Sequence, residues 1–232
     1  MDGRPKRLTV TMLDSKEYAD DVKWFRFRLS EPIEFVPGQF IDLRFPGETR
    51  FHAFSIANSP KNTEEIELIV KKEQDFTTKL FGLAEGMELE SIAPMGQFMH
   101  DLDGDIVTIA GGVGITPFLS LLRWARDFRI KNQQFWLFLS NRTRDRIVCE
   151  DELRELDKLE NLHVVLTLTR EEPEGWDGEL GHFDKEKLLK HLDSFEGKIF
   201  YTCGPGRMVD AIVKLLTDAG VPNEKIRHES WG

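Results

Sequence analysis

The sequence predicts an N-terminal antiparallel β-barrel followed by a five-stranded parallel α/β domain. Three observations predict this arrangement. Residues 1–99 hold short strand patterns separated by prolines, residues 104–232 alternate strand-like with helical runs, and two glycine turns each join a strand end to a helix start. We expect the boundary between a 1–99 domain and a 104–232 domain to lie near residues 99–103.

The N-terminal half has the pattern of a small barrel. The segment DVKWFRFRL at 21–29 places aromatic residues on one face and arginines on the other, which is the period of a half-buried strand. GQFIDLRF at 38–45 and IELIVKKE at 66–73 are further strand candidates, and one helix is expected over 77–86, ending at Gly86. Short strands with frequent turns are typical of a barrel.

The C-terminal half alternates between the two periods. Strands are expected at 105–110, 135–140, 163–169, 198–203 and 225–231. Helices are expected between them, at 116–128, 149–159, 184–192 and 206–220. Five strands alternating with four helices predict a parallel sheet with helices on both faces.

Composition excludes several classes of protein. The chain has 232 residues and a net charge of −10, which argues against general nucleic-acid binding, since that function needs a basic face. No apolar run reaches the length of a membrane helix, and the N-terminus lacks the apolar stretch of a signal peptide, so we expect a cytoplasmic protein. The two cysteines, Cys149 and Cys203, cannot supply the four thiolates of an iron–sulfur cluster, and no metal site is predicted.

The two glycine turns carry the first functional prediction. They lie in AGGVGITPFLSLL at 110–122 and YTCGPGRMVDAIVKLL at 201–216. Glycine lets the backbone approach a ligand closely, and the helix behind it directs free N–H groups at a phosphate. Two such turns in one α/β half predict a dinucleotide lying across the carboxyl ends of parallel strands.

Together with the upstream segment RFHAFSIANSP at 50–60, these turns resemble the ferredoxin–NADP reductase superfamily of FAD-dependent oxidoreductases. GQF at 38–40, DFTTKL at 75–80, APMGQF at 93–98 and the C-terminal Glu-x-aromatic at 229–231 match the family in the same order. The resemblance spans nearly the whole chain. It implies a two-domain form, with an FAD-binding barrel and an NAD(P)-binding domain and without an iron–sulfur module.

The resemblance implies that the 50–60 segment holds the flavin. Phe54 would cover one face of the isoalloxazine ring, and the hydroxyl of Ser55 would lie near the reactive N5. His52 stands where the family usually has arginine, and a neutral imidazole offers one donor in place of a charged fork. Arg50 is an alternative source of that charge. Binding of FMN instead of FAD, and loss of flavin altogether, both stay open.

The resemblance also places five other residues on the flavin. Ile69 and Lys71 would contact it through their backbone, Thr77 and Thr78 through a helix start, and Trp231 as a ring over the second face. A plain N-cap role is the alternative for Thr77.

For NAD(P)H, the string GGVGITP at 111–117 is only a partial dinucleotide fingerprint. The resemblance implies nucleotide contacts from a set in both glycine turns and the strand ends between them: Gly112, Gly114, Thr116, Arg142, Arg170, Cys203, Gly204 and Met208. A small, polarisable thiol at Cys203 would pack against the nicotinamide ring. The predicted catalytic residues are therefore Ser55, Cys203 and Glu229. Of these, Glu229 could relay a proton.

The choice between NADPH and NADH depends on the charge of the residues that follow the second strand of the C-terminal half. NAD-dependent enzymes often place an acidic residue there, whereas this chain has FLSNRTRDR at 138–146. Arginines suit a 2′-phosphate, so NADPH is preferred over NADH, although Glu171, Glu172 and Glu179 are acidic neighbours in sequence.

These observations predict an enzyme that transfers hydride from NAD(P)H to FAD and then electrons to an acceptor. Ferredoxin, flavodoxin or another redox partner such as an oxygenase component would accept them. The alternatives are a reductase subunit of a larger redox or oxygenase complex, a free flavin or ferric reductase, and a non-catalytic nucleotide-binding module. The motifs do not choose the acceptor, because it meets the flavin edge through variable surface.

Overall fold

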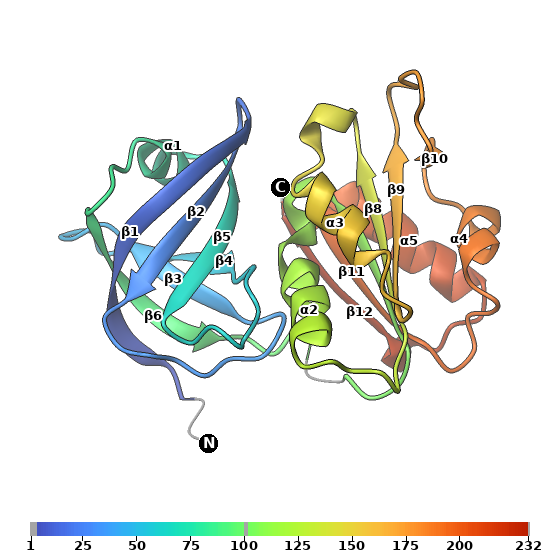
Figure 1. Ribbon diagram of the computed structural model, residues 1–232, viewed down its shortest axis with the longest axis horizontal. Coiled ribbons are helices and arrows are strands. Elements are labelled where there is room, and N and C mark those ends of the chain that lie inside the picture. Colours follow the sequence, from blue (N-terminus) through green and yellow to red (C-terminus); the bar gives the residue numbers. More distant parts are fainter. Residues whose placement is uncertain (1–3, 100–101, 232) are drawn as a thin grey trace. The chain divides into compact units, whose positions relative to one another are not determined.

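The computed structural model describes residues 4–99 and 102–231, and the chain divides into two compact units (Figure 1). The first unit consists of Met1–Met99 with Thr116–Phe128, and the second of His100–Ile115 with Arg129–Gly232. Helix α2 (Thr116–Asp127) therefore groups with the N-terminal strands. The domain boundary near 99–103 stays a prediction.

The first unit contains a six-stranded antiparallel sheet. Its strands are β1 (Lys6–Ala19), β2 (Val22–Leu29), β3 (Phe40–Arg44), β4 (His52–Ser55), β5 (Glu65–Lys71) and β6 (Glu88–Met95). They are ordered β4-β3-β6-β1-β2-β5. The edge strands approach each other where the backbone N–H of Ala57 donates to the carbonyl of Glu67 at 2.8 Å, so the sheet forms a nearly closed barrel, as predicted.

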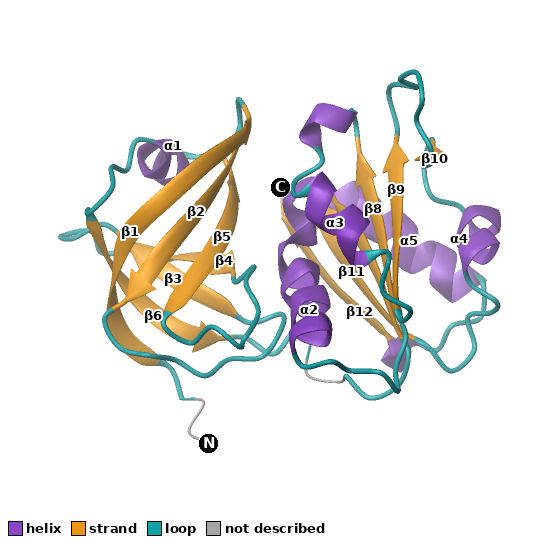
Figure 2. Cartoon of the chain, in the orientation of Figure 1, coloured by secondary structure: helices purple, strands orange, loops and turns teal. Residues whose placement is uncertain are grey.

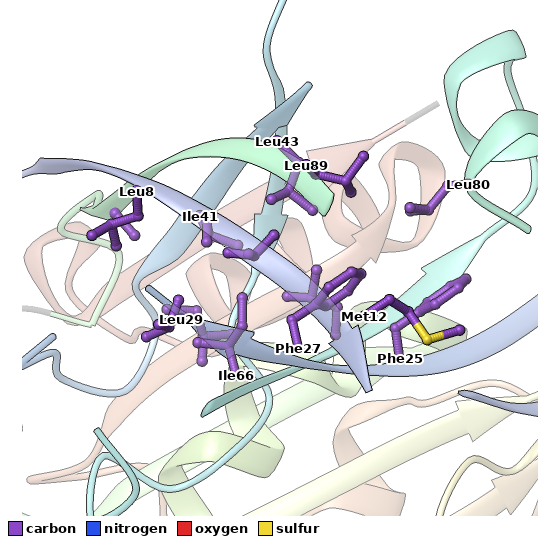
Figure 3. Packing of buried hydrophobic residues seen from close by; sticks show 14 of the residues in the cluster. Leu8, Met12, Phe25, Phe27, Leu29, Ile41, Leu43, Ile66, Leu80 and Leu89 are labelled. Atoms are coloured by element: carbon purple, nitrogen blue, oxygen red, sulfur yellow. The ribbon is translucent and has the colours of Figure 1, made fainter. Parts of the chain in front are cut away.

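The barrel encloses an apolar core. Alternate residues of its strands point inward, among them Phe25, Phe27 and Ile41, each with no exposed surface (Figure 3). At about 25 cal/mol per Å² of apolar surface, this burial is the main term that holds the barrel together.

The helix predicted over 77–86 is displaced. Helix α1 spans Asp75–Phe81 and ends at Gly82, whose N–H bonds to the carbonyl of Lys79. The expected end at Gly86 is wrong: Gly86 has φ +82° and forms the turn into β6, where its N–H donates to the carbonyl of Met12. Gly82 ends the helix before the chain reaches Gly86.

The second unit is a parallel sheet. Its strands are β7 (Ile106–Gly111), β8 (Phe135–Asn141), β9 (Leu162–Leu168), β10 (Glu179–Leu180), β11 (Ile199–Pro205) and β12 (Ile226–Trp231), in the order β10-β9-β8-β7-β11-β12. The five predicted strands are all present, and the two-residue β10 extends one edge. Helix α3 (Glu150–Leu156) lies on one face and α5 (Gly206–Asp218) on the other, while α4 (Lys185–His191) precedes β11 (Figure 2).

Short 3-10 turns join these elements, at Gly112–Ile115, Arg144–Arg146 and Asn223–Lys225. Among the described residues, no helix has both the length and the apolar character needed to cross a membrane.

Candidate functional site

The strand order of the second unit defines a switch point. The chain moves outward from β7 through β8 to β9, then returns to the other side of β7 with β11 and β12. At such a point two neighbouring loops leave the sheet in opposite directions, and their separation opens a crevice at the carboxyl ends of the strands. Here those loops are the two glycine turns, which follow β7 and β11.

The two turns pack directly on each other. A Cβ added at Gly111 would lie 2.6 Å from the Met208 sulfur, and one at Gly204 would lie 2.8 Å from the Met208 methyl carbon and 3.1 Å from the Gly111 nitrogen. No side chain fits at either position, so glycine is required by close approach. Gly112, with φ +55°, and Gly114 continue the first turn. The structure thus brings four predicted residues together: Gly112, Gly114, Gly204 and Met208.

Cys203 lies in the buried part of β11, between Ala110 of β7 and Glu229 of β12 in the sheet register. It is 1% exposed. Burial, and to a lesser extent the neighbouring Glu229, raise the pKa of the thiol well above its usual range, so it stays protonated and is no nucleophile. Glu229 has an exposed side chain, yet loss of hydration around the carboxyl raises its pKa as well.

Arg142 and Arg170 follow adjacent strands. The backbone N–H of Arg170 donates to the carbonyl of Arg142 at 3.0 Å, which fixes the two residues side by side beyond β8 and β9. Both side chains are exposed, and neither forms an ion pair with a carboxylate of any described residue.

The other arginines of this region are engaged. Arg144 binds Glu150 at 2.9 Å, and Arg154 binds Asp177 through two parallel bonds of 3.0 Å. Both guanidinium groups lie near the ring of Trp176, at 5.7 and 5.9 Å from its centroid. The carboxylates offset these two charges, of which that of Arg144 lies in the arginine-rich stretch that the sequence analysis considered for a 2′-phosphate.

In the first unit, strand β4 carries His52, Phe54 and Ser55. The Ser55 hydroxyl is half-buried and forms no hydrogen bond with any described residue. Phe54 is also half-buried and packs beside the core, 5.8 Å from the ring of Phe76. A partly exposed ring beside an unused hydroxyl is suited to an aromatic ligand with a polar edge.

His52 stacks on Phe76, with ring centroids 4.1 Å apart and an angle of 16° between the planes. Burial lowers the pKa of His52, and the positive charge of Arg50 lowers it further. The imidazole is therefore neutral at pH 7, because its ordinary value of 6.5 is already below that pH.

The hydroxyl of Thr77 serves the helix itself. It accepts from the backbone N–H groups of Glu73 and Gln74, each at 3.0 Å, and donates to the carbonyl of Gln74 at 2.9 Å. Thr77 is not the N-cap residue, which is Gln74, so the plain N-cap alternative is wrong in position; Thr77 stands at N3, and its hydroxyl accepts from the backbone of Gln74 in a capping box. Thr78 is exposed on the same turn.

The remaining predicted residues are dispersed. Ile69 is buried on β5, and Lys71, at the end of that strand, pairs with Glu73. Thr116 opens α2 and is 4% exposed. The backbone of Trp231 pairs with Pro205 at the end of β12, and its side chain lies outside the described part of the structure.

Sequence reasoning missed a polar network beside β4. Arg123 of α2 donates to the carbonyl of Ala57 at 3.1 Å and to Glu67 at 2.8 Å, and Glu67 also accepts from the indole of Trp24 at 2.9 Å. The amide of Asn58 accepts from the N–H of Glu67 at 2.8 Å. The only signal that could have indicated this network is the burial of Arg123 among the apolar residues of α2. Periodicity in the sequence does not reveal that burial.

A barrel with an aromatic–hydroxyl strand, and a parallel sheet with two glycine turns at its switch point, define the class of oxidoreductases with a flavin domain and a nicotinamide domain. Family models match both halves: the oxidoreductase FAD-binding domain matches residues 9–100, and the oxidoreductase NAD-binding domain matches residues 108–214. The chain belongs to the ferredoxin–NADP reductase superfamily.

Relatives agree with this assignment. The chain is 33% identical to a Thermococcus kodakarensis protein named "Probable dihydroorotate dehydrogenase B (NAD(+)), electron transfer subunit", over 96% of this chain and 85% of that one. It is 30% identical to the reductase component of propane 2-monooxygenase from Mycolicibacterium smegmatis, over 91% of this chain and 64% of that one. A crystal structure of an Amycolatopsis cytochrome P450 reductase matches with a TM-score of 0.85 and 26% identity, over 97% and 70% of the two chains.

The chain spans less than two thirds of the length of the monooxygenase reductase relatives.

Proposed function

We propose that this protein takes hydride from NAD(P)H onto a flavin held by the barrel and passes the electrons to a separate acceptor. The observation that carries the proposal is the switch point of the second unit. There the two glycine turns, at positions where a Cβ would clash, bring backbone alone to the carboxyl ends of β7 and β11, which is where such sheets hold dinucleotides, and the buried Cys203 lies in β11 just before the second turn. The flavin half of the proposal is supported by strand β4.

The residues of β4 fit a flavin at its ring end. Bound FAD would supply the capacity to accept a hydride and to release electrons singly or in pairs. Phe54 provides a ring for one face, and the unused hydroxyl of Ser55 can donate to a ring nitrogen and so orient the reacting edge.

On the nucleotide side, Cys203 provides a small neutral group. Because its thiol stays protonated, it adds no negative charge that would oppose a nicotinamide. Loss of hydration raises the pKa of Glu229, so its carboxyl holds a proton more readily than that of an ordinary glutamate. We assign Cys203 to positioning and Glu229 to proton exchange.

NADPH is the proposed donor. Arg142 and Arg170 lie side by side with no carboxylate partner among the described residues, so a 2′-phosphate could bind both without breaking an existing ion pair.

The acceptor is proposed to be a protein. Relatives that are reductase components of monooxygenases favour an oxygenase component or a ferredoxin-like carrier. A second candidate, an electron-transfer subunit of a stable complex, is favoured by the similarity to the dihydroorotate dehydrogenase B subunits. Neither Cys149 nor Cys203 forms a disulfide bond with a described residue, which suits the reducing conditions of the cytoplasm, where we place the protein.

The test is the visible absorption spectrum of the purified protein during separate anaerobic additions of NADPH and NADH. We expect a flavin spectrum that bleaches promptly, and faster with NADPH. A protein that stays colourless and binds neither FAD nor FMN would refute the proposal and leave a nucleotide-binding module.

A further inference from the structure

A cavity of about 340 Å³ lies between β4 and α1 in the first unit. Its lining includes His52 and Phe76, which stack on each other, and four charged residues: Glu48, Arg50, Asp75 and Lys79. The cavity adjoins the strand whose next residues are Phe54 and Ser55. Phe54 stands on the same face of β4 as His52, and its ring lies 5.8 Å from that of Phe76, which lines the cavity, so a ligand in contact with Phe54 would lie beside the cavity.

Most polar groups of the cavity are already committed. His52 is neutral at pH 7 and packs face to face on Phe76, so it provides no charge. The hydroxyl of Thr77 is consumed by the cap of α1. Lys79 forms an ion pair with Glu48 at 2.7 Å and lies over the ring of Phe45, 4.0 Å from its centroid. The Lys79 pairing also lowers the pKa of Glu48, which keeps that carboxylate charged.

Arg50 is different. It lines the same cavity as His52, two residues along the chain, and its charge is close enough to lower the pKa of that histidine. Its side chain is exposed and forms no ion pair with a carboxylate of any described residue. Among the cations that line the cavity it is the one whose charge no described carboxylate offsets. A guanidinium presents a planar fork of donors that matches phosphate oxygens.

We propose that Arg50 binds the phosphate group of the flavin in this protein, taking the part that arginine at position 52 would otherwise play. The proposal rests on the proposed function and adds a residue to its flavin site. Asp75, which faces the same cavity with a negative charge, opposes the phosphate and limits the affinity that Arg50 provides.

The test compares three flavins that differ in phosphate. Flavin-free protein is titrated with riboflavin, FMN and FAD, and binding is followed by quenching of flavin fluorescence. We expect Arg50→Gln to weaken FMN and FAD binding about ten-fold, the effect of losing one charge-assisted hydrogen bond, and to leave riboflavin binding unchanged. The loss should shrink as salt is added, because the contact is exposed.

Three further variants locate the charge. Arg28→Gln removes an exposed strand arginine of the same unit that is not part of the cavity lining, and it should leave all three affinities unchanged. The double variant Arg50→Gln/His52→Arg, which moves the charge to position 52, should recover most of the lost FMN and FAD affinity. Asp75→Asn should tighten FMN and FAD binding but not riboflavin binding.

The outcomes separate the two proposals. If the ratio of FAD to riboflavin affinity is the same in Arg50→Gln as in the unmodified protein, Arg50 does not bind the phosphate and this inference is overturned. It is also overturned if Arg28→Gln lowers FAD affinity equally, since the effect would then reflect net charge. If no flavin binds, riboflavin included, the proposed function itself fails.

Discussion

Removing the charge of Glu67 should destabilise the first unit more than its surface position suggests. Glu67 accepts from Arg123 at 2.8 Å and from Trp24 at 2.9 Å, and the side chains of Arg123 and Glu67 are only 11% and 24% exposed. Glu67→Gln keeps an acceptor oxygen but leaves the guanidinium of Arg123 partly desolvated without its counter-charge. Loss of a charge-assisted bond at a half-buried site costs about 2–3 kcal/mol.

For a chain of this size, that cost corresponds to a fall in Tm of about 4–12 °C, followed by circular dichroism during heating. The matched control is Glu31→Gln, which removes the same charge from an exposed pair with Lys6, where the two side chains are 53% and 44% exposed. The control should change stability by less than about 0.5 kcal/mol. A Tm for Glu67→Gln equal to that of the control would refute the reasoning, because the network would then contribute nothing beyond a surface ion pair.

Four other predictions concern the candidate site. Ser55→Ala should slow anaerobic flavin reduction by NADPH about 10–100-fold in stopped-flow measurements, with flavin content retained; an unchanged rate would remove Ser55 from the reacting edge. Because its pKa is raised by burial, Cys203 should resist iodoacetamide at pH 8 while Cys149 reacts, and peptide mass spectrometry that finds Cys203 modified first would contradict this. The double variant Arg142→Gln/Arg170→Gln should raise the KM for NADPH about ten-fold and leave that for NADH unchanged, in steady-state assays with ferricyanide; equal changes in both would exclude 2′-phosphate recognition. His52 has a lowered pKa when folded, so the unfolded chain takes up its proton first as the pH falls through 6.5, and stability is lost below that value; His52→Gln should lose less stability between pH 7.5 and 5.5 in urea unfolding, and an equal loss would show that His52 is not the group responsible.

The sequence predicted the fold class because both halves carry clear periodicity. Alternation along β2 and the strand–helix alternation of the second unit correspond to the elements found. Strand β1 was not predicted, because its inward residues alternate only between Leu8 and Met12 and its second half is polar and charged. The length of α1 was wrong, since two glycines stand near its end and sequence does not tell which one caps the helix.

The candidate site was predictable where backbone geometry decides it. Gly111 and Gly204 are glycines because each backbone lies against the other turn, so their positions in sequence carry the information. The N3 position of Thr77, one turn inside the helix start, and the pairing of Arg144 with Glu150 were not predictable. Such roles depend on which partner lies within about 3 Å in the folded chain, and no local pattern encodes that distance.

Charge pairing explains how phosphates can be recognised by a chain whose net charge is −10. In such a chain a cation near a ligand site is more often neutralised by a carboxylate than left available to a phosphate. Lys79, Arg144 and Arg154 illustrate this. A phosphate gains little from an arginine that must first give up a carboxylate, because one ion pair merely replaces another. The arginines that matter are therefore those beside a cavity or a strand end that no described carboxylate engages, and Arg50 and the Arg142–Arg170 pair satisfy that condition in the two units. Removing an arginine that is paired with a carboxylate should lower the stability of the protein. Removing Arg50, Arg142 or Arg170 should instead lower the affinity for the ligand and leave stability unchanged.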